Sequence, residues 1–195
     1  MNQVFENIAS VIKYRRTNKA ANMNGRPIAN DEIMQLLQLA DYAPTHARTE
    51  PWRFFVYTGA GLEQFCTDHA DMYWQATAEE NRKQATYDSL KANSHTASHL
   101  VIAAMKRTPM AKIPKSEEYA ATAAAVQNIL LGAEALGIAS IWSTGGMALK
   151  PQMKAYLHLE EDDEVLGFVY LGHADVPQRE PLRNIPLEEK IIWHS

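Results

Sequence analysis

The segment from residue 117 to residue 136 constrains the fold of this chain more than any other. Small and aliphatic side chains occupy nearly its whole circumference: Ala120, Ala121, Ala123, Ala124, Ala125, Val126, Ile129, Leu130, Leu131, Ala133 and Leu136. A helix that is apolar on all sides is buried on all sides, and Gly137 stands where a helix C-terminal cap is expected. In a chain of 195 residues, this pattern predicts a central helix with a sheet on one side and a second subunit on the other. We therefore expect a homodimer.

The rest of the chain alternates helical and extended patterns. Apolar side chains at helical spacing predict amphipathic helices over residues 4–16 and 30–43. The polar segment 63–98 predicts one or two surface helices, and Gly59 and Gly61 before it are interpreted as turn residues. Runs of aliphatic, β-branched or aromatic residues predict four strands, at 52–58, 100–105, 138–143 and 165–171.

The C-terminal residues 177–195 have a different character. They contain three prolines yet end in Ile191, Ile192 and Trp193. An extended segment with an apolar tip is typical of an arm that docks on a partner. Since no repeat, low-complexity tract or linker divides the sequence, residues 1–195 are expected to form a single domain.

Composition excludes several classes of protein. The one cysteine, Cys66, cannot form an intrachain disulfide, a CxxC redox pair or a thiolate metal cluster. A balance of 19 Lys+Arg against 23 Asp+Glu argues against a general nucleic-acid partner. No apolar run approaches the ~20 residues of a membrane helix, and the first basic residues follow the apolar ones, unlike a secretory signal. We expect a cytoplasmic protein that binds neither nucleic acid nor membrane.

Common catalytic motifs are also missing from the sequence. His95 and His99 share an i,i+4 spacing but lack the glutamate of an H-E-x-x-H zinc site. No G-x-S-x-G elbow is present, and the glycines at 59 and 61 do not continue into a G-x-G-x-x-G dinucleotide loop. The expectation is that the protein has no metal site and no catalytic acid–base pair of its own.

A basic cluster follows the first predicted helix. Arg15, Arg16, Thr17 and Lys19 place three cations and a hydroxyl within five residues. Guanidinium groups match phosphate oxygens in a bidentate manner, so the cluster is a candidate phosphate site. Cations at a helix C-terminus also complement the helix macrodipole, and this structural role is the alternative.

Two loops are further candidates. Residues 43–54 leave a helix and re-enter the sheet through Pro51-Trp52, where open sheets present ligand-binding groups. A structural role, anchoring the following strand, explains Pro51 and Trp52. It does not explain His46 and Arg48, which are therefore the candidate ligand-binding residues of this loop. The loop 106–115 carries several basic residues and is either a solvated connector or a rim for an anionic ligand.

Three separated segments together resemble the nitroreductase family of FMN-dependent oxidoreductases. Arg15-Arg16-Thr17-x-Lys19 is similar to the family's R-R-S-x-R/K. Ala43-Pro44-Thr45 and Pro51-Trp52-Arg53-Phe54 are similar to A-P-S-x-x-N-x-Q-P-W-x-F. Gly137 to Trp142, after the alanine-rich helix, is similar to G-(L/I)-G-S-x-W, and Gly167 to Gly172 looks like the family's penultimate strand. The order and spacing agree over essentially the whole chain.

The resemblance implies an α+β fold with a mixed, mainly antiparallel central sheet surrounded by helices. It also implies a homodimer that exchanges C-terminal arms and binds non-covalent FMN at each of two interfacial sites. The expected activity is ping-pong transfer of electrons from NAD(P)H, through the flavin, to a nitroaromatic, a quinone or a similar electron-poor small molecule. The cofactor then carries the chemistry, and the protein supplies position and electrostatics.

By resemblance, the cofactor-binding residues are distributed over five segments. Arg15 and Thr17 are placed at the phosphate and ribityl end, with Arg16 beside them, and Lys19 near the pyrimidine edge of the ring. The remaining members of the implied set are Tyr42, His46, Arg48, the late basic residue Arg183 near the phosphate, and Trp142, Ser143 and Thr144 from the partner subunit.

Thr17 and Thr45 replace the family's Ser and keep its hydroxyl, but two other departures change the chemistry of the second motif. Arg48 replaces the family's Asn and Glu50 its Gln, so the pyrimidine edge of the flavin is read differently or through His46. One alternative is therefore a flavin-binding or flavin-sequestering protein that nicotinamide nucleotides do not reduce. Another is an interaction module without flavin, in which Arg15 and Arg16 only cap a helix.

Overall fold

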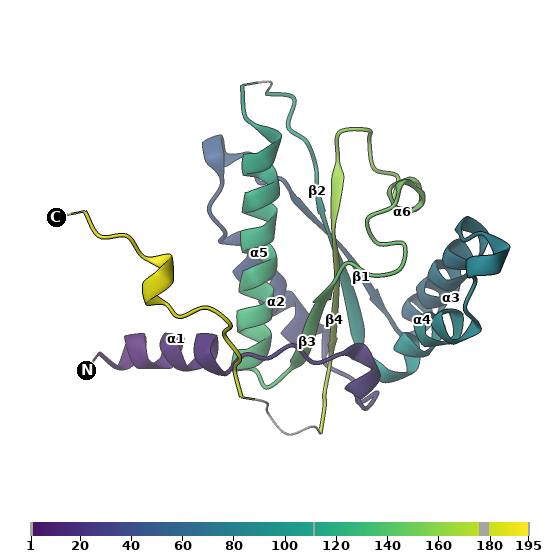
Figure 1. Ribbon diagram of the computed structural model, residues 1–195, viewed down its shortest axis with the longest axis horizontal. Coiled ribbons are helices and arrows are strands. Elements are labelled where there is room, and N and C mark those ends of the chain that lie inside the picture. Colours follow the sequence, from purple (N-terminus) through teal and green to yellow (C-terminus); the bar gives the residue numbers. More distant parts are fainter. Residues whose placement is uncertain (1, 111, 176–179, 195) are drawn as a thin grey trace.

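The protein is a four-stranded antiparallel sheet between two helical layers (Figure 1). The computed structural model describes residues 2–110, 112–175 and 180–194. The strands are β1 (Trp52–Thr58), β2 (His99–Met105), β3 (Ala139–Ser143) and β4 (Glu164–Gly172), in the spatial order β1-β2-β4-β3. All three neighbouring pairs are antiparallel. A single parallel bridge, between Thr17 and Ser140, adds the N-terminal segment to the edge of β3.

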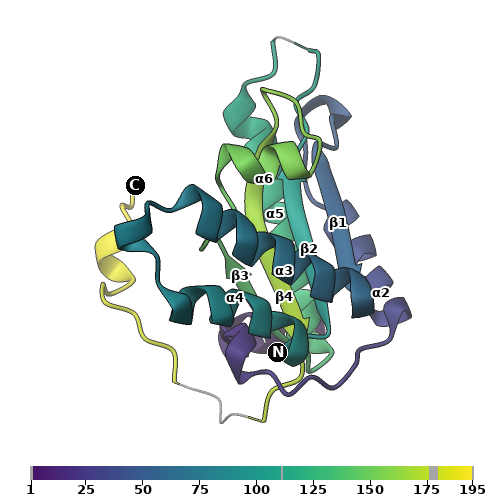
Figure 2. The same ribbon diagram turned by 90° about the vertical axis from the view of Figure 1, so that its right-hand side faces the viewer.

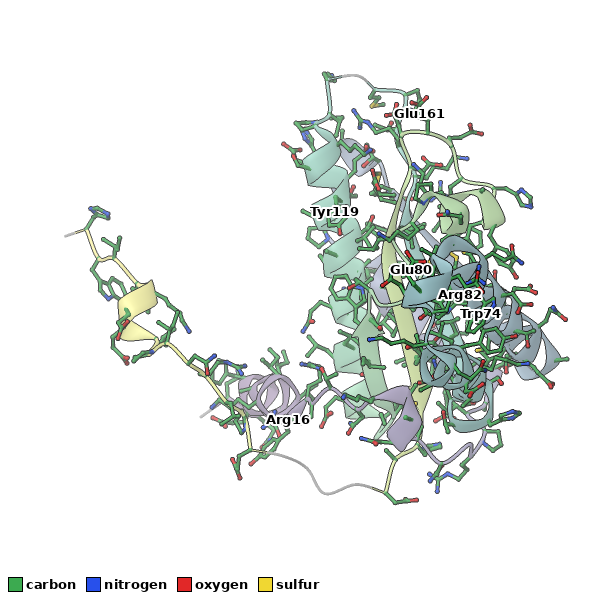
Figure 3. All side chains as sticks on the ribbon, turned by 45° about the vertical axis from the view of Figure 1, so that its right-hand side comes forward. Arg16, Trp74, Glu80, Arg82, Tyr119 and Glu161 are labelled. Atoms are coloured by element: carbon green, nitrogen blue, oxygen red, sulfur yellow. The ribbon has the colours of Figure 1, made fainter. Side chains whose placement is uncertain are left out.

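Helices cover both faces of the sheet. On one face lie α2 (Asn30–Asp41) and α5 (Lys115–Ala135), and on the other lie α3 (Gly59–Ala76), α4 (Gln84–Thr96) and α6 (Pro151–Tyr156), as the two views show (Figures 1 and 2). The N-terminal helix α1 (Gln3–Tyr14) lies across one end of α5. Short 3-10 turns occupy 20–22, 46–48, 79–81 and 188–190. Within the described parts of the chain, every helix is too short or too polar to span a bilayer.

Alternation along the central strand β2 creates two hydrophobic cores. Val101, Ala103 and Met105 face the α2–α5 layer, whereas Leu100 and Ile102 face the α3 layer. Each strand residue sends its side chain to the face opposite its neighbours, and all seven residues of β2 are buried. The sheet is therefore sandwiched: β2 is fully buried, β4 is buried except at its first residue, Glu164, and the edge strands β1 and β3 carry most of the exposed positions.

The structure confirms half of the prediction made for the alanine-rich helix. α5 buries one side against the sheet and against α2, where a β-carbon added to Gly132 would lie 2.7 Å from Leu39 Cδ1. Its opposite side is open in the single chain: Ala120 is exposed, and Tyr119 keeps 41% of its surface. The chain alone therefore contradicts burial on all sides, and the second subunit stays a prediction.

The two terminal segments also expose apolar side chains. No residue of α1 is buried. In the arm, whose residues 176–179 lie outside the described ranges, Ile192 and Trp193 keep 81% and 88% of their surface exposed. The described arm runs away from the body of the chain (Figure 1). Exposed apolar surface of this kind marks an interaction site.

Most predicted elements are confirmed to within one or two residues at each end. The segment 63–98 does contain two helices, and Gly137 caps α5 with φ +68°. Two interpretations are corrected. Gly61 is not a turn residue, because it lies inside α3, whereas Gly59, with φ +52°, does turn the chain from β1 into α3. The short helix α6, with Pro151 at its first position, was not predicted.

A β-bulge in β4 positions the last residues of β3. Ala103 pairs with Gly167 while Ala104 pairs with Val165, so Leu166 is the extra residue. The Leu166 carbonyl accepts a hydrogen bond of 2.9 Å from Trp142 Nε1. Gly167 has φ +135°, and a β-carbon there would lie 2.7 Å from both Ser143 O and Trp142 Nε1. The bulge and the indole therefore require a glycine.

We predict that Gly167→Ala lowers the free energy of unfolding by about 2 kcal/mol or more, because the new β-carbon meets backbone and an indole at a strained φ. Gly61→Ala is the matched control: nothing lies within 4 Å of its added β-carbon, and alanine favours a helix. Urea denaturation of both variants measures the difference. Equal stability of the two variants would contradict the role assigned to the bulge.

Candidate functional site

A basic pocket of about 540 Å³ forms where α1 ends beside the sheet. The last turn of α1 is closed by the Arg15 N–H, which donates to Val11 O at 3.0 Å. The chain then follows the edge of β3, with the Asn18 N–H donating to Ser140 O at 2.9 Å. The pocket is lined by Arg15, Arg16, Thr17, Asn18, Lys19, Asn22, Ile141, Glu180, Pro181, Leu182 and Arg183. The fold therefore brings Arg183, from the C-terminal arm, to the sequence cluster at 15–19.

The cations of the basic pocket do not all have the same role. Arg16 Nη1 donates to Lys13 O at 2.5 Å and Arg15 O at 2.9 Å, so this side chain caps the C-terminus of α1. For Arg16, the structural role at the C-terminus of a helix is thus the correct interpretation. Arg15 and Lys19 form no ion pair with any described residue, and Glu180 is the one acidic residue that lines the pocket. The pocket is an electropositive hollow suited to an oxyanion.

His46 lies in a second, alanine-floored pocket of about 330 Å³ at the other end of α5. Its lining is Pro44, Thr45, His46, Glu117, Ala120, Ala121 and Ala124. His46 Nδ1 lies 2.5 Å from Glu117 Oε2 in the first turn of α5. Sequence reasoning missed Glu117, because 71 positions separate it from His46 and because it was considered only as the start of a helix.

The loop that carries His46 is strained. Ala47, Arg48 and Glu50 have φ of +51°, +56° and +43°, three of the four positive values among described non-glycine residues. Such conformations cost roughly 1 kcal/mol or more each. They persist because both ends of the loop are fixed: Trp52 Nε1 donates to Asp41 Oδ1 at 2.9 Å, and the Lys106 N–H donates to Pro51 O at 2.7 Å.

The other predicted site residues are not gathered with these groups in one chain. Arg48 is exposed and lines neither pocket. Tyr42, 87% exposed, borders an apolar groove between α2 and α5. Trp142 is half-buried against the α5 core. Ser143 Oγ accepts the Gly145 N–H at 3.3 Å, and Thr144 is exposed.

The basic pocket and the alanine-floored pocket lie at opposite ends of α5. The basic pocket adjoins β3, which begins just after the C-terminus of α5, whereas Glu117 is in the first turn of α5. A helix of 21 residues is about 30 Å long at 1.5 Å per residue. A single chain therefore presents two separate pockets, divided by the length of α5.

Two of the four basic side chains in the loop 106–115 are engaged within the chain. Arg107 forms an ion pair with the buried Glu118 and donates to Ile113 O at 2.6 Å, and Lys115 pairs with Glu164 at 2.7 Å. These contacts favour the connector interpretation over an anion-binding rim. No group of three or more potential metal-ligating side chains occurs in the described residues, and both ring nitrogens of His99 have partners, Ser98 and Asn30.

His69 is a buried polar residue that sequence reasoning also missed. Its Nε2 accepts the Met147 N–H at 3.0 Å, which fixes the turn after Thr144. Nδ1 therefore carries the proton, and it has no partner among the described residues. Burial lowers the pKa of His69 to about 4. The contact is close, because a β-carbon on Gly146 would lie 2.6 Å from Nε2.

Comparison with known proteins defines the class. Residues 12–173 match the Nitroreductase family, and the chain belongs to this family of oxidoreductases. It is 25% identical over 142 residues, 73% of this chain and 75% of the other, to the protein named "Putative NAD(P)H nitroreductase YdjA" of Escherichia coli (strain K12).

Solved structures agree with this assignment. A nitroreductase-like protein from Bacillus cereus superimposes with a TM-score of 0.82 at 27% identity, covering 96% of this chain and 95% of that one. The fold is shared with an NADPH:FMN oxidoreductase from Vibrio harveyi, solved with NAD+, at a TM-score of 0.72 and 16% identity, covering 97% and 77% of the two chains.

We predict a pH dependence of stability that originates at His69. The unfolded imidazole binds a proton near pH 6.5 and the folded one only near 4. The unfolded state therefore binds more protons between these values, so stability is complete above about pH 6.5 and falls as the pH is lowered. The loss by pH 4 is about 3 kcal/mol. His69→Gln keeps an acceptor for Met147 and removes the titration. The test is chemical denaturation of the wild-type protein and of His69→Gln at pH 7 and pH 4. Equal losses of unfolding free energy in the two proteins would contradict a role of His69.

Proposed function

We propose that the protein is an FMN-dependent oxidoreductase that passes electrons from NAD(P)H to electron-poor small molecules such as nitroaromatics or quinones. The observation that carries the proposal is the convergence of Arg15, Thr17, Lys19 and Arg183 on one pocket in a chain of the nitroreductase family. Relatives named for NAD(P)H and FMN support the same chemistry.

The residues of the basic pocket fit a flavin phosphate. A phosphate monoester is a dianion with three acceptor oxygens. The Arg15 and Arg183 guanidinium groups and the Thr17 hydroxyl supply donors from two segments, held together by the edge of β3 and the arm. Arg16 contributes indirectly, by holding the last turn of α1 that presents Arg15.

Lys19 is assigned to the ring end of the cofactor. Bound flavin supplies hydride acceptance from the nicotinamide and hydride donation to the second substrate. A cation near the pyrimidine edge stabilises the negative charge that the reduced ring acquires. Flavin held by these residues would exchange electrons with the nicotinamide and the acceptor in turn, which would give ping-pong kinetics.

The complete site is formed by two copies of the chain. An antiparallel, twofold arrangement of α5 helices places the basic pocket of one copy beside the alanine-floored pocket of the other. The open side of α5, the unburied α1 and the apolar arm residues are the surfaces that such a homodimer covers. In this arrangement His46, Tyr42 and Arg48 reach the flavin from elements that do not line the basic pocket of one chain, and Trp142 to Thr144 reach it from the end of the partner's β3.

The proposal predicts a yellow protein that retains FMN through purification. Under anaerobic conditions, NADH or NADPH should bleach its visible flavin absorption, and a quinone or nitroaromatic should restore it. A flavin-bound protein that neither nucleotide reduces would instead support flavin sequestration, and a protein that takes up no FMN would support an interaction module.

Paired variants of α1 test where the phosphate binds. Arg15→Ala should weaken FMN binding by about 10- to 100-fold, the loss expected for hydrogen bonds to a charged group. Lys13→Ala removes a cation from the same helix end but outside the pocket, and should leave the affinity unchanged. Equal affinities of the two variants, measured by quenching of flavin fluorescence, would remove Arg15 from the phosphate site.

A further inference from the structure

The contact between His46 and Glu117 is an acid–base pair that the linear sequence conceals. His46 Nδ1 lies 2.5 Å from Glu117 Oε2, and the two side chains keep 56% and 47% of their surface exposed. Because a carboxylate only accepts hydrogen bonds, Nδ1 carries the proton in this pair. Within the described residues, Nε2 has no hydrogen-bond partner and is the ring nitrogen left for another molecule.

The surroundings of the pair indicate a binding site. Both residues line the alanine-floored pocket, in which Ala120, Ala121 and Ala124 contribute only methyl groups. The pair is therefore the charged wall of a hollow in which Thr45 is the one other polar lining residue, and the Thr45 hydroxyl is hydrogen-bonded to Thr49. Such a combination of apolar surface and few polar groups is typical of small-molecule sites.

Energetics also separate this pair from an ordinary surface ion pair. An exposed ion pair contributes about 0–1 kcal/mol to stability. The loop that holds His46 against Glu117 contains the three strained residues at 47, 48 and 50. The pair alone does not offset this strain, which the contacts at the ends of the loop sustain, and strained backbone of this kind is concentrated at functional sites.

We propose that His46 donates a proton to the electron acceptor and that Glu117 is the positioning residue that holds its Nε2 toward the substrate. This inference rests on the proposed flavin chemistry and adds a proton donor to it. It also revises the expectation that the protein has no acid–base pair.

The step balances for a quinone. The quinone takes a hydride, two electrons and one proton, from the bound reduced flavin, which is thereby oxidised. The Nε2–H bond of the His46 imidazolium breaks, and the second O–H bond of the hydroquinone forms. The neutral ring keeps its Nδ1 proton on the Glu117 carboxylate, and solvent returns a proton to Nε2. The carboxylate pairs the imidazolium charge before the transfer and fixes the tautomer after it.

The first measurement uses flavin-free protein. With the imidazole neutral, 15N NMR of wild-type protein should show the Nδ1–H tautomer of His46. Glu117→Leu should shift the ring toward the Nε2–H form that dominates in water, and Glu117→Gln, which keeps an acceptor oxygen, should restore Nδ1–H. Glu164→Leu is the matched control. Glu164, in β4, forms a similarly exposed ion pair with Lys115, which lies in the same turn of α5 as Glu117. Its replacement should leave the tautomer of His46 unchanged.

The second measurement separates the two half-reactions in stopped flow. Reduction of the flavin by NAD(P)H needs no proton from His46 and should change less than about twofold in Glu117→Leu, while reoxidation by a quinone should slow by about tenfold or more. Glu117→Gln should recover part of the loss, and Glu164→Leu should be normal in both steps.

Each remaining outcome overturns the inference. An unchanged tautomer in Glu117→Leu shows that the carboxylate does not position the ring. Equal slowing of both half-reactions shows a role in flavin binding rather than in proton transfer. If wild-type protein binds FMN but no nucleotide reduces it, the proposed function and the proton donor fail together, while the tautomer result still reports on the pair itself.

Discussion

The close packing of α5 is the constraint on which the rest of the structure depends. Its small residues allow the sheet and α2 to approach, and at Gly132 a single β-carbon would meet Leu36 and Leu39 at under 3 Å. As a consequence Val101, Ala103 and Met105 of β2 are buried on this face of the sheet. The same helix separates the two pockets by its own length, about 30 Å. α5 thus organises the core on one side and sets the distance between the two pockets on the other.

Three features that restrict the backbone lie next to the predicted flavin-binding segments. Positive φ angles gather in the loop of His46, the bulge at Gly167 holds Trp142, and His69 fixes the turn after Thr144 at the expense of an unpartnered Nδ1. Each of these features reduces the freedom of a segment that the proposed cofactor contacts. Preorganisation of this kind is what a protein contributes when the cofactor carries the chemistry.

The sequence predicted those parts of the fold whose signals are local. Fully apolar strands, an amphipathic α1 and an alanine-rich α5 are recognisable from spacing alone, and Arg15 to Lys19 are neighbours in sequence as in space. Pairings between distant segments could not be predicted: His46 with Glu117, His69 with Met147, and Lys115 with Glu164 join positions 49 to 78 residues apart. The basic loop at 106–115 was ambiguous for this reason, since the partners of its cations were not identifiable. Arg16 is an example: the basic motif is compatible with phosphate binding and with capping of α1, and only the three-dimensional structure shows that the Arg16 side chain caps the helix.

A complementation experiment tests most directly whether two chains build each flavin site. Arg15→Ala damages the basic pocket, and His46→Ala damages the alanine-floored pocket. When the two variants are coexpressed with different tags and the mixed dimer is isolated, one of its sites carries both defects and the other carries neither. The account predicts that the mixed dimer binds FMN tightly at one of its two sites, while each variant homodimer binds it weakly at both. A mixed dimer whose two sites both bind FMN weakly would place the whole site within one chain and contradict the account.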